Sequence, residues 1–339
     1  MKKITFSILT ILILITTKGF SQSDFLKIDE FARSTEFNPN KSLAKELTKN
    51  LNTDLEKVRA IFVWIADNIE YDFELNQSPE LQEEIYTSTN DVIEHTLNSK
   101  KAICSGYSFL LKSLCDDAGI ECVYIEGISR QYLESNKEKN VPDHAWNAVK
   151  IDEKWFLLDA TWASGNGFGN QFKKEFDDYW FLTNPEEFFY SHFPVELKWT
   201  LLDDQFDREK FYSLPATISH RLFTLGVTVV NPKSGTIEVG ANNKIVFEYE
   251  VENLETVVSL YGSPWETYAT LNNLPEPTDE EFKKNPSNYN LIIPSIELID
   301  KKTYGNKVTL EYNVIHSTLN SITLSINGLQ TAEYKVEWK

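Results

Sequence analysis

The hydrophobic positions in the first third of the chain recur every three or four residues, a pattern typical of amphipathic helices. This spacing predicts helices over residues 25–32 and 43–51. A longer helix is predicted after Thr53, because the run Thr-Asp-Leu-Glu forms a capping box ahead of apolar residues at helical spacing. Residues 74–90 are polar and predict a loop, and Asn90 is the expected N-cap of a further short helix.

The segment Lys101 to Ile120, KAICSGYSFLLKSLCDDAGI, predicts a helix with a cysteine at its start. Apolar residues follow Cys104 at steps of three and four, and Gly119 ends the pattern as a C′ residue. Cys104 is therefore expected in or just before the first turn. Unpaired backbone N–H groups and the positive end of the helix dipole favour a thiolate there, so the position suits a nucleophile.

After Gly119 the pattern changes to strict alternation, which predicts strands and a charged loop. The expected strands cover residues 121–129, 144–151 and 154–161, and the loop covers 131–142. With Asp152-Glu153 as the two-residue turn of the last hairpin, Asp159 lies opposite Trp146 and diagonal to His144. With Ile151-Asp152 as the turn, it lies directly opposite His144. Both registers place the two side chains on one face of the sheet.

Residues beyond Pro215 form short runs of β-branched and aromatic residues separated by turn signals, which predicts an all-β region. Residues 243–251 and 306–314 share five identities in nine positions. One enlarged sandwich and two small β units both remain open for this region.

The first 21 residues predict a cleaved secretory signal peptide, with two lysines, an apolar run and small residues near Ser21. The alternative is an uncleaved N-terminal anchor. We therefore expect a secreted or periplasmic protein. An odd number of cysteines in such a protein leaves one thiol free. Cys115 and Cys122 could form a bridge, although two buried thiols are favoured, and Cys104 is unpaired in either case.

The chain is acidic, and this limits its partners. Its net charge of −18 becomes −21 without residues 1–21, which hold three lysines and no acid. Such a surface repels nucleic acid and anionic lipid. No other segment is long and apolar enough to span a bilayer. We expect a protein or peptide substrate, no nucleic acid and no stable membrane insertion.

A nucleophilic thiol needs a base that takes its proton and a group that orients the base. His144 and Asp159 supply these types on adjacent predicted strands. The other histidines are assigned structural surroundings: His95 a solvated helix, His192 an aromatic packing segment, and His220 and His316 the β region. The sequence contains no motif with metal-ligand spacing, and Gly165, Gly167 and Gly169 predict a flexible loop rather than a phosphate site.

Three short motifs resemble the transglutaminase-like superfamily, whose members are related to the papain-like cysteine peptidases. They are Cys-Ser-Gly-Tyr at 104–107, His-Ala-Trp at 144–146 and Asp-Ala-Thr-Trp at 159–162. The aromatic segment 180–202 is similar to the kyphoscoliosis peptidase branch. The resemblance covers roughly residues 50–205.

The resemblance implies an α+β fold in which the cysteine helix packs on an antiparallel sheet. The strand pattern beyond Pro215 predicts an immunoglobulin-like β region after it. The expected domains are 22–214 and 215–339. The resemblance also implies a catalytic triad of Cys104, His144 and Asp159 for acyl transfer. We expect no cofactor and no metal from the missing motifs, and Trp64 is considered as a second oxyanion donor. We favour an enzyme, and among enzymes a peptidase or amidase over a cross-linking transglutaminase. The alternative is an inactive scaffold that binds envelope or adhesion proteins.

Overall fold

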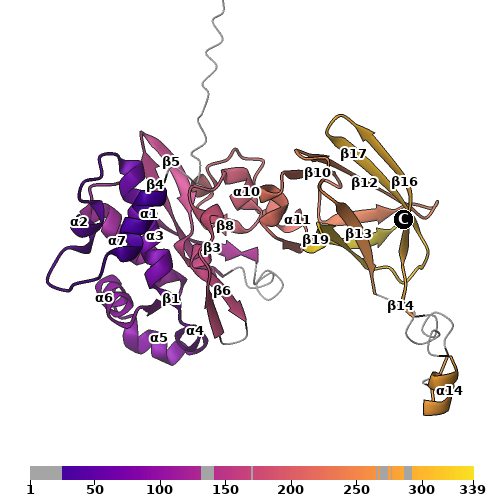
Figure 1. Ribbon diagram of the computed structural model, residues 1–339, viewed down its shortest axis with the longest axis horizontal. Coiled ribbons are helices and arrows are strands. Elements are labelled where there is room, and N and C mark those ends of the chain that lie inside the picture. The colour runs from indigo at the N-terminus through magenta and orange to yellow at the C-terminus, as the bar shows by residue number, and fades with distance from the viewer. Residues whose placement is uncertain are drawn as a thin grey trace, which may run out of the picture.

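The chain combines a helical and mixed body with an all-β body (Figure 1). The computed structural model describes residues 25–130, 141–168, 171–264, 266–267, 274–275, 277–285 and 292–339. The expected signal peptide lies outside the described residues, as does most of the predicted charged loop. In the described part of the chain, none of the helices has the length and apolar character needed to cross a membrane.

Four helices form the N-terminal layer: α1 (Leu26–Ser34), α2 (Leu43–Thr48), α3 (Asp54–Asn68) and α7 (Cys104–Asp117). Helix α3 begins as predicted, because the Thr53 side chain accepts from the N–H of Glu56 and the Glu56 side chain accepts from the N–H of Thr53. Nine consecutive residues of α3 are buried, so this helix is the centre of the first hydrophobic core.

The predicted loop over residues 74–90 is wrong. The segment contains α4 (Phe73–Gln77), α5 (Pro79–Ile85) and the start of α6 (Thr89–Ser99). Side chains of Asp72, Ser78 and Ser88 cap the three helices, so the N-cap of α6 is Ser88 and not Asn90. Helices α4 and α5 bury only Leu75 between them, which explains why they leave no periodic apolar signal.

A four-stranded antiparallel sheet faces the helices. Its order is β5 (Lys154–Leu158), β4 (His144–Ile151), β3 (Cys122–Ser129) and β8 (His192–Pro194). Ile151 pairs with Lys154, so the first of the two registers is confirmed. Asp152 and Glu153 both have positive φ, 47° and 62°, as a two-residue hairpin turn matching the strand twist requires.

Two elements after β5 differ from expectation. The strand ends at Leu158, and Asp159 caps the short helix α9 (Ala160–Ala163) where the strand was expected to continue to residue 161. The glycine segment forms a hairpin of β6 (Gly165–Phe168) and β7 (Gln171–Lys174) in place of the expected loop; Gly169 lies outside the described residues. The aromatic segment then folds as η3 (Asp178–Trp180), α10 (Pro185–Phe189), β8 and η4 (Leu197–Thr200).

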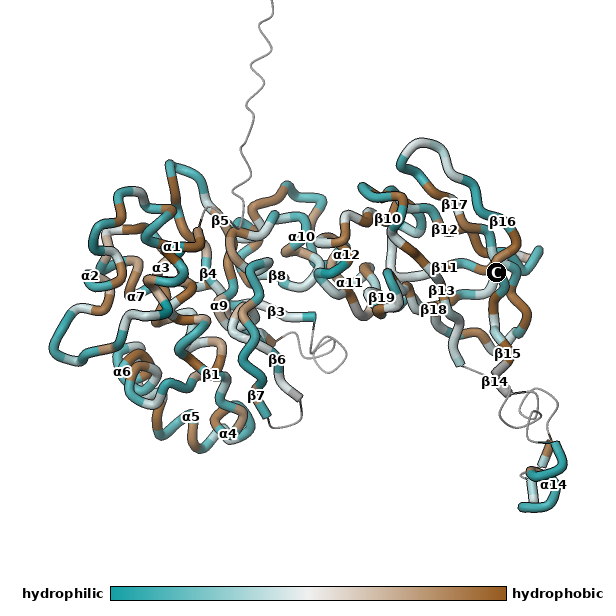
Figure 2. Tube along the Cα trace, viewed as in Figure 1, coloured by the Kyte–Doolittle hydropathy of each residue, from teal (hydrophilic) through white to brown (hydrophobic). Residues whose placement is uncertain are grey.

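The last third of the chain builds two sheets around one core (Figure 2). One sheet has the order β10 (Val227–Asn231), β12 (Lys244–Val251), β17 (Lys307–Val314) and β16 (Ile296–Tyr304). The other has the order β11 (Thr236–Val239), β19 (Leu329–Trp338), β18 (Ser321–Ile326) and β13 (Val258–Ser263), and β9 (Thr217–Ile218) also pairs with β19. The similar segments 243–251 and 306–314 are the neighbouring strands β12 and β17. The immunoglobulin-like character and the domain limits stay predictions.

The remaining described elements are short: β1 (Glu70–Tyr71), β2 (Lys101–Ala102), α11 (Arg208–Ser213), α12 (Arg221–Thr224), β14 (Glu266–Thr267), α14 (Asp279–Lys284) and β15 (Ile292–Ile293). Strands β1 and β2 pair in parallel. This pairing joins the chain just before α4 to the chain just after α6, next to the start of α7.

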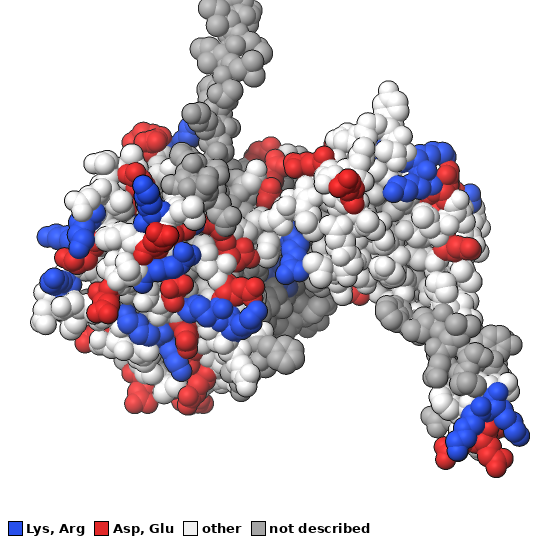
Figure 3. All heavy atoms as spheres, in the orientation of Figure 1, with Lys and Arg blue, Asp and Glu red and all other residues white. Residues whose placement is uncertain are grey.

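Acidic and basic side chains are interspersed on the face shown in Figure 3. Lysines and arginines lie beside aspartates and glutamates over the helical body, so the excess of acid does not gather there into one large patch.

Candidate active site

Cys104 is the first residue of α7, as predicted. The N-cap, Ile103, makes no side-chain capping bond, and its carbonyl oxygen accepts from the N–H of Gly106, so the N–H groups of Cys104 and Ser105 are the ones available beside the half-buried sulfur. Gly106 in the same turn allows close packing: a Cβ there would lie 2.6 Å from the Cβ of Ala102 and 2.9 Å from the hydroxyl of Tyr86. The start of this helix is therefore held tightly against its neighbours.

His144 and Asp159 meet in the buried interior, as their predicted positions on one face of the sheet require. His144 Nε2 lies 2.7 Å from Asp159 Oδ2, and both residues are less than a tenth exposed. His144 begins β4 opposite Gly127 of β3. A Cβ on Gly127 would lie 2.3 Å from the ring of Trp146, so the small residue leaves space for this indole in the sheet.

Cys104 and His144 also interact. Cys104 is close enough to His144 to act on its imidazole, and its effect is to raise the pKa of His144. Burial lowers the pKa of His144, but the charge and hydrogen bond of Asp159, with a smaller contribution from Cys104, raise it to about 10. His144 is therefore an imidazolium at neutral pH.

The Asp159 carboxylate has two roles. Oδ1 accepts from the backbone N–H groups of Thr161 and Trp162, at 2.8 and 3.0 Å, and so caps α9. Oδ2 accepts from imidazole nitrogens. Burial raises the pKa of Asp159, yet the charge and hydrogen bonds of the imidazoles hold it well below its usual range. Asp159 therefore both caps a short helix and contacts the imidazole of His144.

The second imidazole belongs to His192, which the sequence analysis assigned to aromatic packing. Its Nε2 lies 3.1 Å from Asp159 Oδ2, and only 1% of the residue is exposed. Strand β8 brings it there by pairing with β3, with His192 opposite Ser129. The pairing joins segments more than 60 residues apart, and nothing in the local sequence pattern signals it.

His144, Asp159 and His192 together have the residue types of a metal site, with one ligand atom from each within 4.8 Å of the others. However, both imidazole nitrogens contact the same oxygen directly, at 2.7 and 3.1 Å, and the second oxygen is taken by backbone N–H groups. Hydrogen bonds among the three groups account for this geometry. The expectation of no metal stays a prediction.

Trp64 is not available as an oxyanion donor, so that suggestion is wrong. Its indole is fully buried in the core, and Nε1 donates to the carbonyl oxygen of Thr35 at 2.7 Å. The backbone N–H of Cys104 remains a candidate donor. Cys115 and Cys122 are free, buried thiols, as favoured, and the neighbouring thiol of Cys122 together with burial raises the pKa of Cys115.

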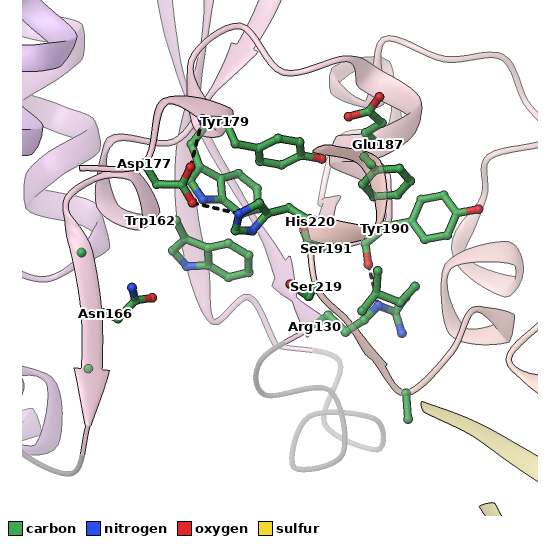
Figure 4. A pocket seen from close by; sticks show the side chains of 16 residues that line it. Arg130, Trp162, Asn166, Asp177, Tyr179, Glu187, Tyr190, Ser191, Ser219 and His220 are labelled. Atoms are coloured by element: carbon green, nitrogen blue, oxygen red, sulfur yellow. Dashed lines mark hydrogen bonds and ion pairs between the residues drawn. The ribbon is translucent and has the colours of Figure 1, made fainter. Parts of the chain in front are cut away.

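A cavity of about 440 Å³ lies next to the site, between the mixed body and the segment leading to the β body (Figure 4). Trp162 lines it, and the same indole packs 5.3 Å from the His144 ring. A second histidine and aspartate, His220 and Asp177, form an ion pair of 3.0 Å in its wall. Cys104 and His144 do not line the cavity, so it borders the candidate site without containing the sulfur.

Residues 41–160 match the model of the transglutaminase-like superfamily. This segment contains Cys104, His144 and Asp159, and the chain therefore carries a transglutaminase-like domain.

Kyphoscoliosis peptidase from Mus musculus is 32% identical over 219 residues, 60% of this chain and 32% of that protein. Hillarin from Drosophila melanogaster is 27% identical over 218 residues, 57% of this chain and 25% of that protein. A crystal structure of a TGase aligns at 18% identity and a TM-score of 0.29, over 48% of this chain and 37% of that one. The matched part of the chain thus spans about a third or less of these curated relatives.

Proposed function

We propose that this protein is a thiol acyl-transfer enzyme with Cys104 as nucleophile, His144 as general acid and base, and Asp159 as the group that orients His144. The observation that carries the proposal is the 2.7 Å hydrogen bond between His144 Nε2 and Asp159 Oδ2, together with a cysteine close enough to His144 to raise the pKa of the imidazole. The name of the relative in mouse, kyphoscoliosis peptidase, points to the same chemistry.

The reaction follows from the roles of these groups. The Cys104 thiolate attacks an amide carbonyl carbon, the carbon–nitrogen bond breaks, and the leaving amine takes a proton from His144. A thioester remains on the sulfur. Water then gives a proton to His144 and adds to the thioester, the carbon–sulfur bond breaks, and the carboxylic acid leaves. The backbone N–H of Cys104 is a donor for the oxyanion of each tetrahedral intermediate.

We favour hydrolysis, as a peptidase or amidase, over cross-linking. Water is the abundant acyl acceptor unless a site excludes it, and Cys104 is only half-buried. The expected substrates are proteins or peptides. The signal-peptide pattern of residues 1–21 supports a secreted or periplasmic location, which N-terminal sequencing of the exported chain tests: a start near Gln22 agrees with it.

Alkylation with iodoacetamide tests the activated thiol. Mass mapping after labelling at pH 7 separates Cys104 from the buried thiols of Cys115 and Cys122, which serve as internal controls. We expect rapid labelling of Cys104 and a loss of about 100-fold in its rate in His144→Ala, because the base is removed. Equal, slow labelling of Cys104 in both proteins would contradict the enzymatic proposal and favour the inactive scaffold.

A further inference from the structure

We propose that His192 is a positioning residue for the active site: a neutral imidazole that donates Nε2–H to Asp159 Oδ2 and so fixes the carboxylate that orients His144. The inference rests on the proposed function. His192 acts through Asp159 and not on the reacting atoms, which separates it from the three catalytic residues.

The hydrogen bonds around Asp159 explain why a second imidazole matters. Oδ1 accepts two backbone N–H groups and Oδ2 accepts from His144 at 2.7 Å and from His192 at 3.1 Å. Each carboxylate oxygen therefore accepts two hydrogen bonds, and all four acceptor positions of the buried carboxylate are used. Without His192, the only side chain that binds Oδ2 is His144, which Asp159 has to orient. The carboxylate oxygen would then move with the His144 ring during proton transfer.

The protonation state of His192 follows from its two neighbours. Burial, with a smaller contribution from the positive charge of His144, lowers the pKa of His192 to about 4 against the opposing effect of Asp159. It is neutral at pH 7 and carries one N–H. Asp159 can only accept, so the hydrogen is on Nε2. Nδ1 then accepts from the Ser191 hydroxyl at 2.7 Å, which turns its one hydrogen to the imidazole in preference to the Phe188 carbonyl oxygen at 3.1 Å. The single negative charge of Asp159 then faces one positive charge, that of His144.

Aromatic rings hold His192 in this orientation. Its ring stacks on Phe188 with a centroid distance of 4.0 Å and an interplanar angle of 21°. The rings of Trp162 and Trp146 lie 4.5 and 4.9 Å away. Trp162 and Trp146 also contact the His144 ring, so the two imidazoles share one aromatic enclosure around the carboxylate. The histidine cannot turn away without opening this packing.

The test compares the rate of Cys104 alkylation by iodoacetamide in wild type, His192→Phe and His192→Gln between pH 5 and 11. Phenylalanine keeps a ring in the enclosure but has no N–H, whereas glutamine keeps an N–H donor. We expect a 10- to 100-fold lower rate at pH 7 in His192→Phe, the range for a lost hydrogen bond to a charged group, and substantial rescue in His192→Gln.

The pH profile gives a readout that a merely structural role would not move. Without His192, the negatively charged oxygen Oδ2 of Asp159 interacts with His144 alone. It then stabilises the protonated form of His144 more strongly. We expect the alkaline limb of the profile, where His144 loses its proton, to shift to higher pH in His192→Phe. The matched control is His220→Phe, since His220 also pairs with an aspartate, Asp177, but outside the site. This variant is expected within about twofold of wild type at every pH.

A measurement on the unmodified protein keeps the inference testable if His192→Phe does not fold. Nitrogen-15 shifts of the histidine rings are expected to show His192 protonated on Nε2 only, without titration between pH 5 and 9. A proton on Nδ1 instead, or titration in this range, overturns the inference, as does a folded His192→Phe with wild-type rate and profile. The proposed function fails separately, when wild-type Cys104 is no more reactive than in His144→Ala.

Discussion

At the scale of a single residue, Asp159 has both a structural role and a role in the candidate site. It follows the end of β5, where one carboxylate oxygen caps α9 and the other accepts hydrogen bonds from two imidazoles. Because the carboxylate is fully buried, it stays charged only through these four hydrogen bonds and the positive charge of His144. The position of His144 is thus fixed by the same residue that ends the strand beside it.

Asp159→Asn should destabilise the fold by about 3 kcal/mol, since it leaves a buried imidazolium without its counter-charge. An amide also presents only one acceptor oxygen, so the cap or the imidazole contact is lost. Urea denaturation at pH 7 measures the change. Asp177→Asn is the matched control: its pair with His220 is about a third exposed, so its loss should cost less than about 1 kcal/mol. Equal effects of the two changes would contradict the role given to Asp159.

The three catalytic candidates could be predicted from the sequence because each depends on local structure. Cys104 follows from the start of a periodic segment, and the approach of Asp159 to His144 follows from a two-residue turn that sets the register. His192 could not be predicted, because its position depends on the pairing of β8 with β3. An aromatic segment around it is compatible with simple packing.

At the scale of elements, helix α7 depends on its close contact with α6 and the segment before it. Gly106 faces Thr96 of α6 and the hydroxyl of Tyr86, and a Cβ would lie 2.8 and 2.9 Å from them. Such distances are shorter than carbon contacts allow, so this face of α7 accepts only glycine. The same first turn carries Cys104, and tight packing there keeps the sulfur in place.

Gly106→Ala should therefore lower the free energy of unfolding by about 1 to 3 kcal/mol through overpacking. The sign is diagnostic, because alanine in an uncrowded helix interior is more favourable than glycine by about 1 kcal/mol. Thermal unfolding followed by circular dichroism measures the effect. The neighbouring change Ser105→Ala, at a half-buried position, is expected to stay within about 0.5 kcal/mol of wild type. A more stable Gly106→Ala protein would refute the packing argument.

At the scale of the whole molecule, Arg130 connects the mixed body to the start of the β body. Its guanidinium is buried and donates to the carbonyl oxygens of Tyr190, Phe211 and Pro215. It also lies 4.3 Å from the centre of the Phe211 ring. Ile218 of β9 packs against a small core formed around Phe211, and also against the core of the β sheets, so the junction is continuous.

Arg130→Ala should loosen this junction, because three buried carbonyl oxygens lose a charged donor. We expect a destabilisation of about 3 kcal/mol and faster proteolysis between residues 207 and 220. Calorimetry and limited trypsin digestion provide the two readouts. Arg221→Ala removes an exposed arginine of α12 and serves as the control, with little expected change. An intact junction in Arg130→Ala would show that apolar packing alone holds the two bodies together.

The sequence by itself determined the features whose hydrogen bonds and apolar contacts lie within a few residues of one another. These are the capped start of α3, the helix that begins at Cys104, and the hairpin that carries His144 toward Asp159. Only the tertiary structure decided that His192 would join them, that α4 and α5 would form in a polar segment, and that Arg130 would bind carbonyls more than 80 residues away. The local hydrophobic pattern predicts whether a segment is a helix or a strand. Which distant elements pair depends on how they are buried and aligned, and a short segment carries no information about that.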